Sequence, residues 1–132
     1  MIIHTAIRNA LVTRLQAIVP EANVLDGAPR FLQPEDLPAL AVWISDAEYQ
    51  GETVDGDDWT AILHIGVFLG LHSHDNELDR WIEEKIYPAL DEDSGLSALI
   101  SLMTPQGYHY QHDDELGVWA AAEITYQITY DM

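Results

Sequence analysis

A long alternation of apolar and polar positions marks the segment from Trp59 to Gly70. Every second residue of this segment is apolar, and these residues share one face: Trp59, Ala61, Leu63, Ile65, Val67 and Leu69. Because successive side chains of an extended chain point to opposite sides, a period of two predicts a β-strand with one buried face. The opposite face mixes His64 with glycine and apolar residues, so we expect it to be only partly covered.

The period changes to that of a helix directly after this strand. Apolar residues recur every four positions at Leu78, Ile82, Ile86 and Leu90, with Trp81 and Ala89 beside them. This spacing forms one stripe of an amphipathic helix. We expect Ser73 or Asp75 to cap the N-terminus, and Pro88, which has no N–H to donate, to end or kink the helix. A strand that leads into such a helix predicts that the helix packs back on the buried face of a sheet.

The first half of the chain contains a helix and a second strand. Residues 4–19 have apolar positions at helical spacing, with Thr5 as the expected cap and Pro20 as the stop. Residues 23–25 form an expected short strand, and residues 38–49 alternate as a strong one. The acidic, glycine-bearing stretch 51–58 lies between two strands, so we expect a hairpin loop longer than a two-residue turn.

The C-terminal part contains one more helical segment and a second hairpin. Ser94 is the expected cap of a helix whose stripe is Leu96, Leu99, Ile100 and Met103, and residues 105–107 break it. Strand 108–112, turn 113–117 and strand 118–130 follow. The element order predicts an α+β fold: a mostly antiparallel sheet of about four strands in two hairpins, with helices packed on one face. The length of 132 residues predicts a single domain over 1–132.

The charge of the chain is strongly one-sided. It has 23 acidic and 5 basic residues, a formal net charge of −18, and the basic residues do not cluster. Nucleic-acid binding depends on neutralising phosphates with Lys and Arg, so this chain is not expected to bind DNA on any broad surface. A lining that repels DNA or a partner with a basic face fits the charge, as does solubility alone.

Cysteine content and hydropathy further narrow the class of protein to which this chain belongs. The chain has no cysteine, which excludes disulfides and thiol catalysis. It has no apolar run of about 18 residues, so no segment is expected to span a membrane. The first residues do not form a basic leader with a cleavage site, so we expect synthesis in the cytosol without export.

The sharpest candidate for chemistry is the pair His72 and His74. An H-x-H pair on an extended segment is able to place two imidazoles near one metal ion, with His64, His109 and His112 as further ligands if the strands lie side by side. The alternative interpretation of the histidine pair is a polar turn between a strand and a helix, without a bound metal. The acidic stretch Asp55-x-Asp57-Asp58 has part of a calcium loop but lacks the distant glutamate of that motif.

Nothing in the sequence completes an active site. Ser45 and Ser101 lack the context of a nucleophile elbow, and neither a phosphate loop nor a dinucleotide fingerprint occurs. Glu123, on a strand face of small residues, is expected to face solvent or a neighbouring subunit. The residues by themselves predict a compact acidic module for binding or assembly.

Several stretches together resemble the tail terminator family of long-tailed phages, the lambda-type minor tail protein U. They begin with residues 31–41 and continue through AVWISDAEYQGE, LHIGVFL, NELDRWIEEKIYP and the terminal GYHYQHDDELGVWAAAEITYQITYDM. In the last stretch the Gly-Tyr, Asp-Asp, Gly-x-Trp and Thr-Tyr-x-Ile-Thr-Tyr elements keep their order and spacing. The resemblance spans nearly the whole chain and is weakest in the first helix, at residues 71–75 around the histidine pair, and at residues 91–97.

This resemblance implies an assembly role rather than an enzyme. Proteins of the family form a homohexameric ring on the head-proximal end of the tail tube, stop tube growth and offer a surface to the head-completion proteins. The implied partners are other copies, the tail tube protein and a head-completion or connector protein, without nucleic-acid specificity, membrane or cofactor. The implied location is the virion tail, and the host cytoplasm during assembly. Two alternatives are a neck or head–tail connector subunit, and a small metal-dependent enzyme that uses His72 and His74.

A ring of this kind predicts where the contacts lie. Each contact in a cyclic ring joins two different surfaces. The candidates for the basic side are Arg30, Arg80 and Lys85. The candidates for the acidic side are Glu52, Asp55, Asp57 and Asp58 in the first hairpin, and Asp113 and Asp114 in the second. The net charge also predicts that assembly depends on ionic strength or divalent cations, because like charges repel within about 8 Å at physiological salt.

Overall fold

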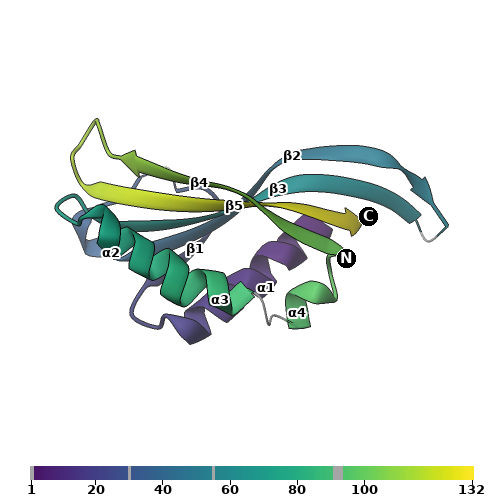
Figure 1. Cartoon of the computed structure of the whole chain (residues 1–132), viewed down its shortest axis with the longest axis horizontal. Helices are drawn as coiled ribbons and strands as arrows, with labels where there is room; N and C mark the ends of the chain where they lie inside the picture. The colour runs from purple at the N-terminus through teal and green to yellow at the C-terminus, as the bar shows by residue number, and fades with distance from the viewer. Residues whose placement is uncertain (1, 30, 55, 91–93) are drawn as a thin grey trace.

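The computed structural model describes residues 2–29, 31–54, 56–90 and 94–132. They form one five-stranded sheet with helices on one of its faces (Figure 1). The strands are β1 (Asn23–Asp26), β2 (Ala39–Thr53), β3 (Gly56–Gly70), β4 (Leu102–His112) and β5 (Trp119–Asp131). Their order across the sheet is β1-β2-β3-β5-β4.

The expected α+β fold is confirmed, with one strand more than the four of the two hairpins. Strands β2 to β5 pair antiparallel, as expected for two hairpins. The additional strand β1 pairs parallel with the start of β2, from Asn23 opposite Ala39 to Asp26 opposite Val42. The segment expected as a short strand therefore extends the sheet at the β2 edge.

The helices lie together beneath the sheet (Figure 1). They are α1 (Ile3–Ile18), α2 (Asp75–Arg80), a π-helical segment η2 (Trp81–Ile86), α3 (Tyr87–Leu90) and α4 (Ser94–Ser97), with a short 3-10 turn η1 (Pro34–Asp36) before β2. No helix in the described parts of the chain is long and apolar enough to cross a membrane.

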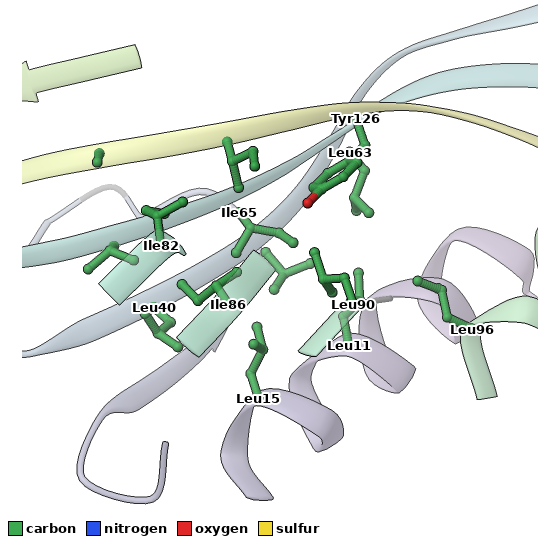
Figure 2. Close-up of a cluster of buried hydrophobic side chains, with 14 of the residues drawn as sticks. Leu11, Leu15, Leu40, Leu63, Ile65, Ile82, Ile86, Leu90, Leu96 and Tyr126 are labelled. Atoms are coloured by element: carbon green, nitrogen blue, oxygen red, sulfur yellow. The ribbon is translucent and has the colours of Figure 1, made fainter. Parts of the chain in front are cut away.

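The main core lies between the helices and the apolar face of the sheet. Figure 2 shows side chains from both layers meeting there. The sheet contributes Leu40, Leu63, Ile65 and Tyr126, and the helices contribute Leu11, Leu15, Ile82, Ile86, Leu90 and Leu96. The apolar faces expected for the strand from Trp59 and for the helix from Leu78 are both confirmed. The alternating apolar residues of the strand and the apolar residues repeated every four positions in the helix pack in this core.

The expected long loop at residues 51–58 is wrong. Strand β2 continues to Thr53 and β3 begins at Gly56, so most of this stretch is strand. Glu52 pairs with Asp57 and Gly51 with Asp58, with register shifts between Ser45 and Glu48 and between Tyr49 and Gly51. Gly51 and Gly56 have φ values of 131° and 146°, which residues with a side chain rarely adopt. The glycines that suggested a loop therefore permit the irregular pairing of the two strands.

The expected helix ends are also corrected. Of the two effects expected of Pro88, an end or a kink, the end is wrong, because the helix from Asp75 continues to Leu90. The preceding segment Trp81–Ile86 is π-helical, and the N–H of Tyr87 bonds to the carbonyl of Ile82, five residues back. Proline lacks an N–H and its ring crowds the preceding turn of a regular α-helix, and a wider turn before it relieves both problems.

The expected caps are wrong at two helices. Helix α2 begins after His74 rather than at Ser73, and no side chain caps it. Helix α1 begins after Ile2, so Thr5 lies inside it. The side chain of Ser94, the expected cap of the third helix, lies outside what the structure describes.

The third helical segment is much shorter than its apolar spacing suggests. Helix α4 ends at Ser97, and Met103 belongs to β4, which starts at Leu102. Residues 105–107 therefore do not interrupt regular structure. Pro105 instead lies at a register shift of the edge strand β4, where a residue without an N–H is tolerated.

Candidate functional site

The described basic residues are confined to one layer of the molecule, whereas acidic residues occur in both layers. None of the five strands contains Lys or Arg, whereas they contain Asp26, Asp46, Glu48, Glu52, Asp57, Asp58, Glu123 and Asp131. The basic residues in the described part of the chain are all on helices: Arg8 and Arg14 on α1, Arg80 on α2 and Lys85 on η2. The sheet is therefore an acidic layer, and the helices carry the described positive charge.

Among the candidates for a basic contact surface, the structure separates Lys85 from Arg80. The Lys85 ammonium lies 3.0 Å from Glu21 and 4.1 Å from the centre of the Trp81 ring. Its partner is thus a residue that follows α1, not a neighbour on its own helix. Arg80 is exposed and has no ion pair within the described residues, and Arg30 lies outside them. Of the three candidates, Arg80 is the one that is exposed and without an ion pair in the described residues, so its charge is available for a contact with another molecule.

The first acidic candidates lie on a projecting hairpin. We define the arm as residues 49–54 and 56–58, the end of the β2–β3 hairpin, whose base pairs with β5 at Asp131 and whose tip projects beyond the other strands (Figure 1). Glu52 and Asp57 are opposite each other on it, and Asp55 lies outside the described residues. Val54 at its tip is fully exposed and Tyr49 is half exposed. The arm therefore presents apolar side chains within an acidic hairpin.

A pair of carboxylates stands where the arm leaves the sheet. Asp58 lies directly opposite Asp131 near the C-terminus. A hydrogen bond to the Asp131 carboxyl raises the pKa of Asp58 above its ordinary value, with smaller contributions from desolvation and from the charge of Asp131. Asp58 therefore binds a proton more readily than an isolated aspartate, because its protonated form donates a hydrogen bond to the neighbouring carboxylate.

The second acidic candidates lie at the opposite end of the sheet, in the β4–β5 turn. Asp113 does not present its carboxylate outward: it accepts hydrogen bonds from the N–H groups of Val118 (2.9 Å), Leu116 (3.1 Å) and Glu115 (3.2 Å). These bonds lower the pKa of Asp113, that of Val118 most. Asp114 beside it is exposed. The structure thus does not bring the two acidic candidate groups onto one surface.

The face of the sheet away from the helices carries a polar cluster that the sequence did not reveal. His64 Nε2 lies 2.7 Å from Ser45 Oγ, and His64 Nδ1 contacts Glu123 Oε1. The Trp43 ring stacks on His64 with centroids 5.0 Å apart. Glu123, expected to face solvent or a neighbouring subunit, instead has a partner within the chain. The only sequence signal was that His64 and Glu123 are polar interruptions of two strongly apolar strands.

This cluster has the order of a serine, a histidine and a carboxylate, but its surroundings do not favour acyl transfer. The Ser45 hydroxyl also lies 3.2 Å from Asp46 Oδ2. Acyl transfer needs hydrogen-bond donors where negative charge develops, and here the adjacent group is a carboxylate. The cluster instead fastens three neighbouring strands to one another.

The histidine pair proposed as metal ligands lies apart from this cluster. His72 is in the turn after β3 and His74 immediately precedes α2, and both are exposed. In the parts of the chain that the structure describes, no group of three or more His, Asp or Glu side chains is arranged to hold a metal ion.

A concave surface lies between the helix and the edge strand β4. Asp79 Oδ1 accepts hydrogen bonds from Tyr108 (2.7 Å) and Tyr110 (2.5 Å), which tie the strand to α2. These bonds lower the pKa of Asp79, and burial followed by the bond to Asp79 raises that of Tyr108. Next to them is an open groove of about 520 Å³, lined by Ile82, Glu83, Tyr87, Tyr108, Tyr110 and Ile124. We call this the tyrosine groove.

The sequence matches the family described as phage minor tail protein U over residues 2–130. The chain belongs to this family. It is 48% identical over 130 residues to the tail tube terminator protein of Escherichia phage N15, and 44% identical over 129 residues to that of Escherichia phage lambda. In both comparisons 98% of this chain and 98% of the relative are covered.

The minor tail protein U family is the one that the quoted stretches suggested, so that expectation is confirmed. The match includes the first helix and the histidine pair, where the resemblance was weakest. A weaker likeness, with a TM-score of 0.46 and 14% identity, covers 99% of this chain and 98% of a chain from the virion of a native gene transfer agent particle.

Proposed function

We propose that this chain is a structural protein of the phage tail that ends the growth of the tail tube. The observation that carries the proposal is its identity of 48% and 44%, over almost its whole length, to two proteins named tail tube terminators. Relatives of this kind are structural components of the virion and not enzymes. The surroundings of Ser45 and the exposed position of the histidine pair agree with a role without catalysis.

We further propose that copies of the chain form a hexameric ring at the head-proximal end of the tube. The ring closes the tube to further subunits and presents its other side to the head-completion proteins. The distribution of charge supports this arrangement, because a sheet with many carboxylates and no Lys or Arg gives passing DNA no surface to which it binds.

Charge pairs across the ring are a second part of the proposal. Arg30, Arg80 and Lys85 are the candidates for the basic side of the contact. The candidates for the acidic side are Glu52, Asp55, Asp57, Asp58, Asp113 and Asp114. The exposed, unpaired position of Arg80 supports its inclusion, whereas the hydrogen bonds of Asp113 within its own turn make its neighbour Asp114 the stronger candidate there.

Growth of tail tubes in the presence of the purified protein tests the main proposal. Tube subunits polymerise on preformed tails, and tube lengths are measured by electron microscopy. We expect growth to stop when the protein is added, and the capped tails to join heads. Tubes that keep their growth rate with the protein in excess would rule out the terminator role.

Charge reversal at two sites tests the proposed ion pairs. Because Arg30→Glu and Arg80→Glu replace attraction by repulsion, we expect each to weaken ring formation, measured by light-scattering mass, and head joining. Arg8→Glu is unsuitable as a control because Arg8 pairs with Asp26 at 2.6 Å within the chain. Glu84→Gln, on the same helical layer as Arg80, is the matched control. If both reversals leave rings and head joining intact, the assignment of the basic side is wrong.

A further inference from the structure

Ion pairs alone do not hold copies of this chain together. The chain has 23 acidic and 5 basic residues, and Arg8 and Lys85 already pair within it. Neighbouring copies therefore repel each other on balance. Burial of apolar surface is the remaining attraction of sufficient size, since it does not depend on the sign of charge.

The exposed large apolar side chains gather in different parts of the molecule. Around the arm and the two chain ends are Ile2, Tyr49, Val54, Leu102 and Met132. Tyr87 and Tyr110 lie at the tyrosine groove, whereas Phe31 and Leu116 lie apart from it at the β4–β5 turn, where they line a separate concave surface. A closed ring joins one surface of each copy to a different surface of the next, so two separated apolar groups are what it requires.

The strand register sets the separation of these groups. Asp58, at the base of the arm, is opposite Asp131, whereas Tyr110 in the tyrosine groove is opposite Ala122. Residues 122 and 131 are about 30 Å apart along β5 at the usual rise of a strand. The arm extends further still, away from the groove (Figure 1). An arm is therefore placed to reach a neighbouring copy and not its own groove.

The tyrosine groove has the composition of a contact site. Ile82 and Ile124 are buried at its floor, and Tyr87 and Tyr110 remain 40% and 46% exposed at its rim. Tyrosine is enriched among the residues that carry most binding energy at protein interfaces. The hydrogen bonds of Asp79 to Tyr108 and Tyr110 hold this wall in place before any partner arrives. Arg80, exposed and unpaired in the described structure, follows Asp79 and offers one positive charge beside the groove.

Pairing of free strand edges is a less suitable way to join copies. Strand β2 beyond the end of β1 contains two register shifts and a positive φ of 53° at Asp46. Strand β4 contains Pro105 at its own register shift. Bulges and proline are the devices by which edge strands avoid pairing with other chains. Contact through side chains is therefore favoured over an extended sheet.

We propose that the end of the arm, with Tyr49 and Val54, seats in the tyrosine groove of the next copy. This inference rests on the proposed function, because it assigns the contact that closes the ring. The partner surface is a second copy of this chain. Glu52, which the strand register places on the same face as Tyr49, then lies toward Arg80 of the neighbour.

Chemical cross-linking tests the contact directly, because the chain has no cysteine of its own. The double variant Val54→Cys/Tyr87→Cys is treated with a short bismaleimide, both in solution under assembly conditions and on isolated tail tubes. We expect a ladder of covalent oligomers up to the hexamer. The matched control is Val54→Cys/Leu116→Cys, since Leu116 is also exposed and apolar but lies in the β4–β5 turn outside the groove.

The outcomes separate this inference from the proposed function. Oligomers that form without cross-linking at positions 54 and 87, or that cross-link equally in the control, overturn the contact and leave the terminator role intact. Absence of a ladder both in solution and on tubes also overturns it. Failure of the unmodified protein to stop tube growth, measured separately, overturns the proposed function instead.

Paired single variants provide a second test that does not need a cross-link. Val54→Asp removes the arm contact and Tyr87→Asp removes the groove contact, so each alone is expected to raise the protein concentration needed for assembly at least about tenfold. A mixture of the two retains one intact arm and one intact groove, which predicts a 1:1 dimer by light scattering and no ring. Leu116→Asp is the matched control and is expected to assemble normally. Normal rings from Val54→Asp would contradict the proposal.

Discussion

At the scale of single residues, Asp113 shows how a charge on the surface of a turn is used within the chain. Its two carboxylate oxygens accept three backbone hydrogen bonds from the turn that they span. Turns built in this way fix the backbone locally, which is why aspartate is common in them. Asp114, one residue later, has the same charge but is exposed. The two residues therefore have different expected roles despite their identical chemistry.

Asp113→Ala is expected to lower the melting temperature by a few degrees at neutral pH, because three N–H groups lose their acceptor. The folded pKa of Asp113 is below its ordinary value of 3.8. Its stabilisation is therefore full above that value and is lost as the pH falls through the depressed pKa. Thermal unfolding followed by circular dichroism should show a gap between variant and parent at pH about 7 that shrinks toward pH about 2. Asp114→Ala is the control, and an equal loss from it would contradict this role.

At the scale of elements, the link between β4 and α2 is the feature that shapes the tyrosine groove. Strand β4 is an edge strand with one pairing partner, and the two tyrosine hydroxyls that reach Asp79 give it a second attachment. The hydrogen-bonded carboxylate is the ionised form, as the lowered pKa of Asp79 indicates. One helix side chain thus holds two positions of the strand against the helix.

Asp79→Ala is expected to loosen β4 without unfolding the sheet. Both hydroxyls lose their acceptor, so hydrogen exchange at the backbone amides of residues 107–112 should become faster, while exchange in β3 stays unchanged. Hydrogen–deuterium exchange with mass spectrometry measures both segments in one experiment. Glu83→Ala, on the same helix and next to the groove but without a hydroxyl partner in the described structure, is the control. Unchanged protection of β4 in Asp79→Ala would show that strand pairing alone holds it.

At the scale of the whole molecule, the net charge of −18 bears on the proposed assembly. Copies that approach each other must bring acidic surfaces within the range where charges interact, about 8 Å at physiological salt. Inside one chain, Asp58 and Asp131 already stand side by side, and their hydrogen bond, more than the charge of Asp131, raises the pKa of Asp58. Any agent that screens or neutralises carboxylates should therefore favour oligomers.

Oligomer mass is expected to increase with ionic strength and with Mg²⁺. Multi-angle light scattering at fixed protein concentration, across separate titrations of NaCl and MgCl₂, measures this. A divalent effect larger than NaCl at equal ionic strength would point to cation binding between carboxylates, and an equal effect to screening. A mass that does not change in either titration would contradict the proposed dependence of assembly on ionic strength and divalent cations.

Local patterns in the sequence predicted much of the fold because burial imposes a period on each element. The alternation at Trp59–Gly70 and the four-residue repeat from Leu78 define faces that only a strand and a helix bury. The same patterns failed at residues 51–58, and at Pro88 they left open whether the helix ends or kinks. Polar residues and glycine pair there as irregular strands, and a π-helical segment accommodates the proline. Both outcomes depend on partners that the local pattern does not contain.

The sequence by itself determined the two hairpins with helices on one face, the acidic charge and the family. It did so because periodicity, composition and motif spacing are written along the chain. Only the tertiary structure decided that His64 meets Glu123 and Ser45, that Asp79 holds two tyrosines, and that the arm lies far from the tyrosine groove. Strand order and register bring residues together across large sequence separations, and these are set by how whole faces pack.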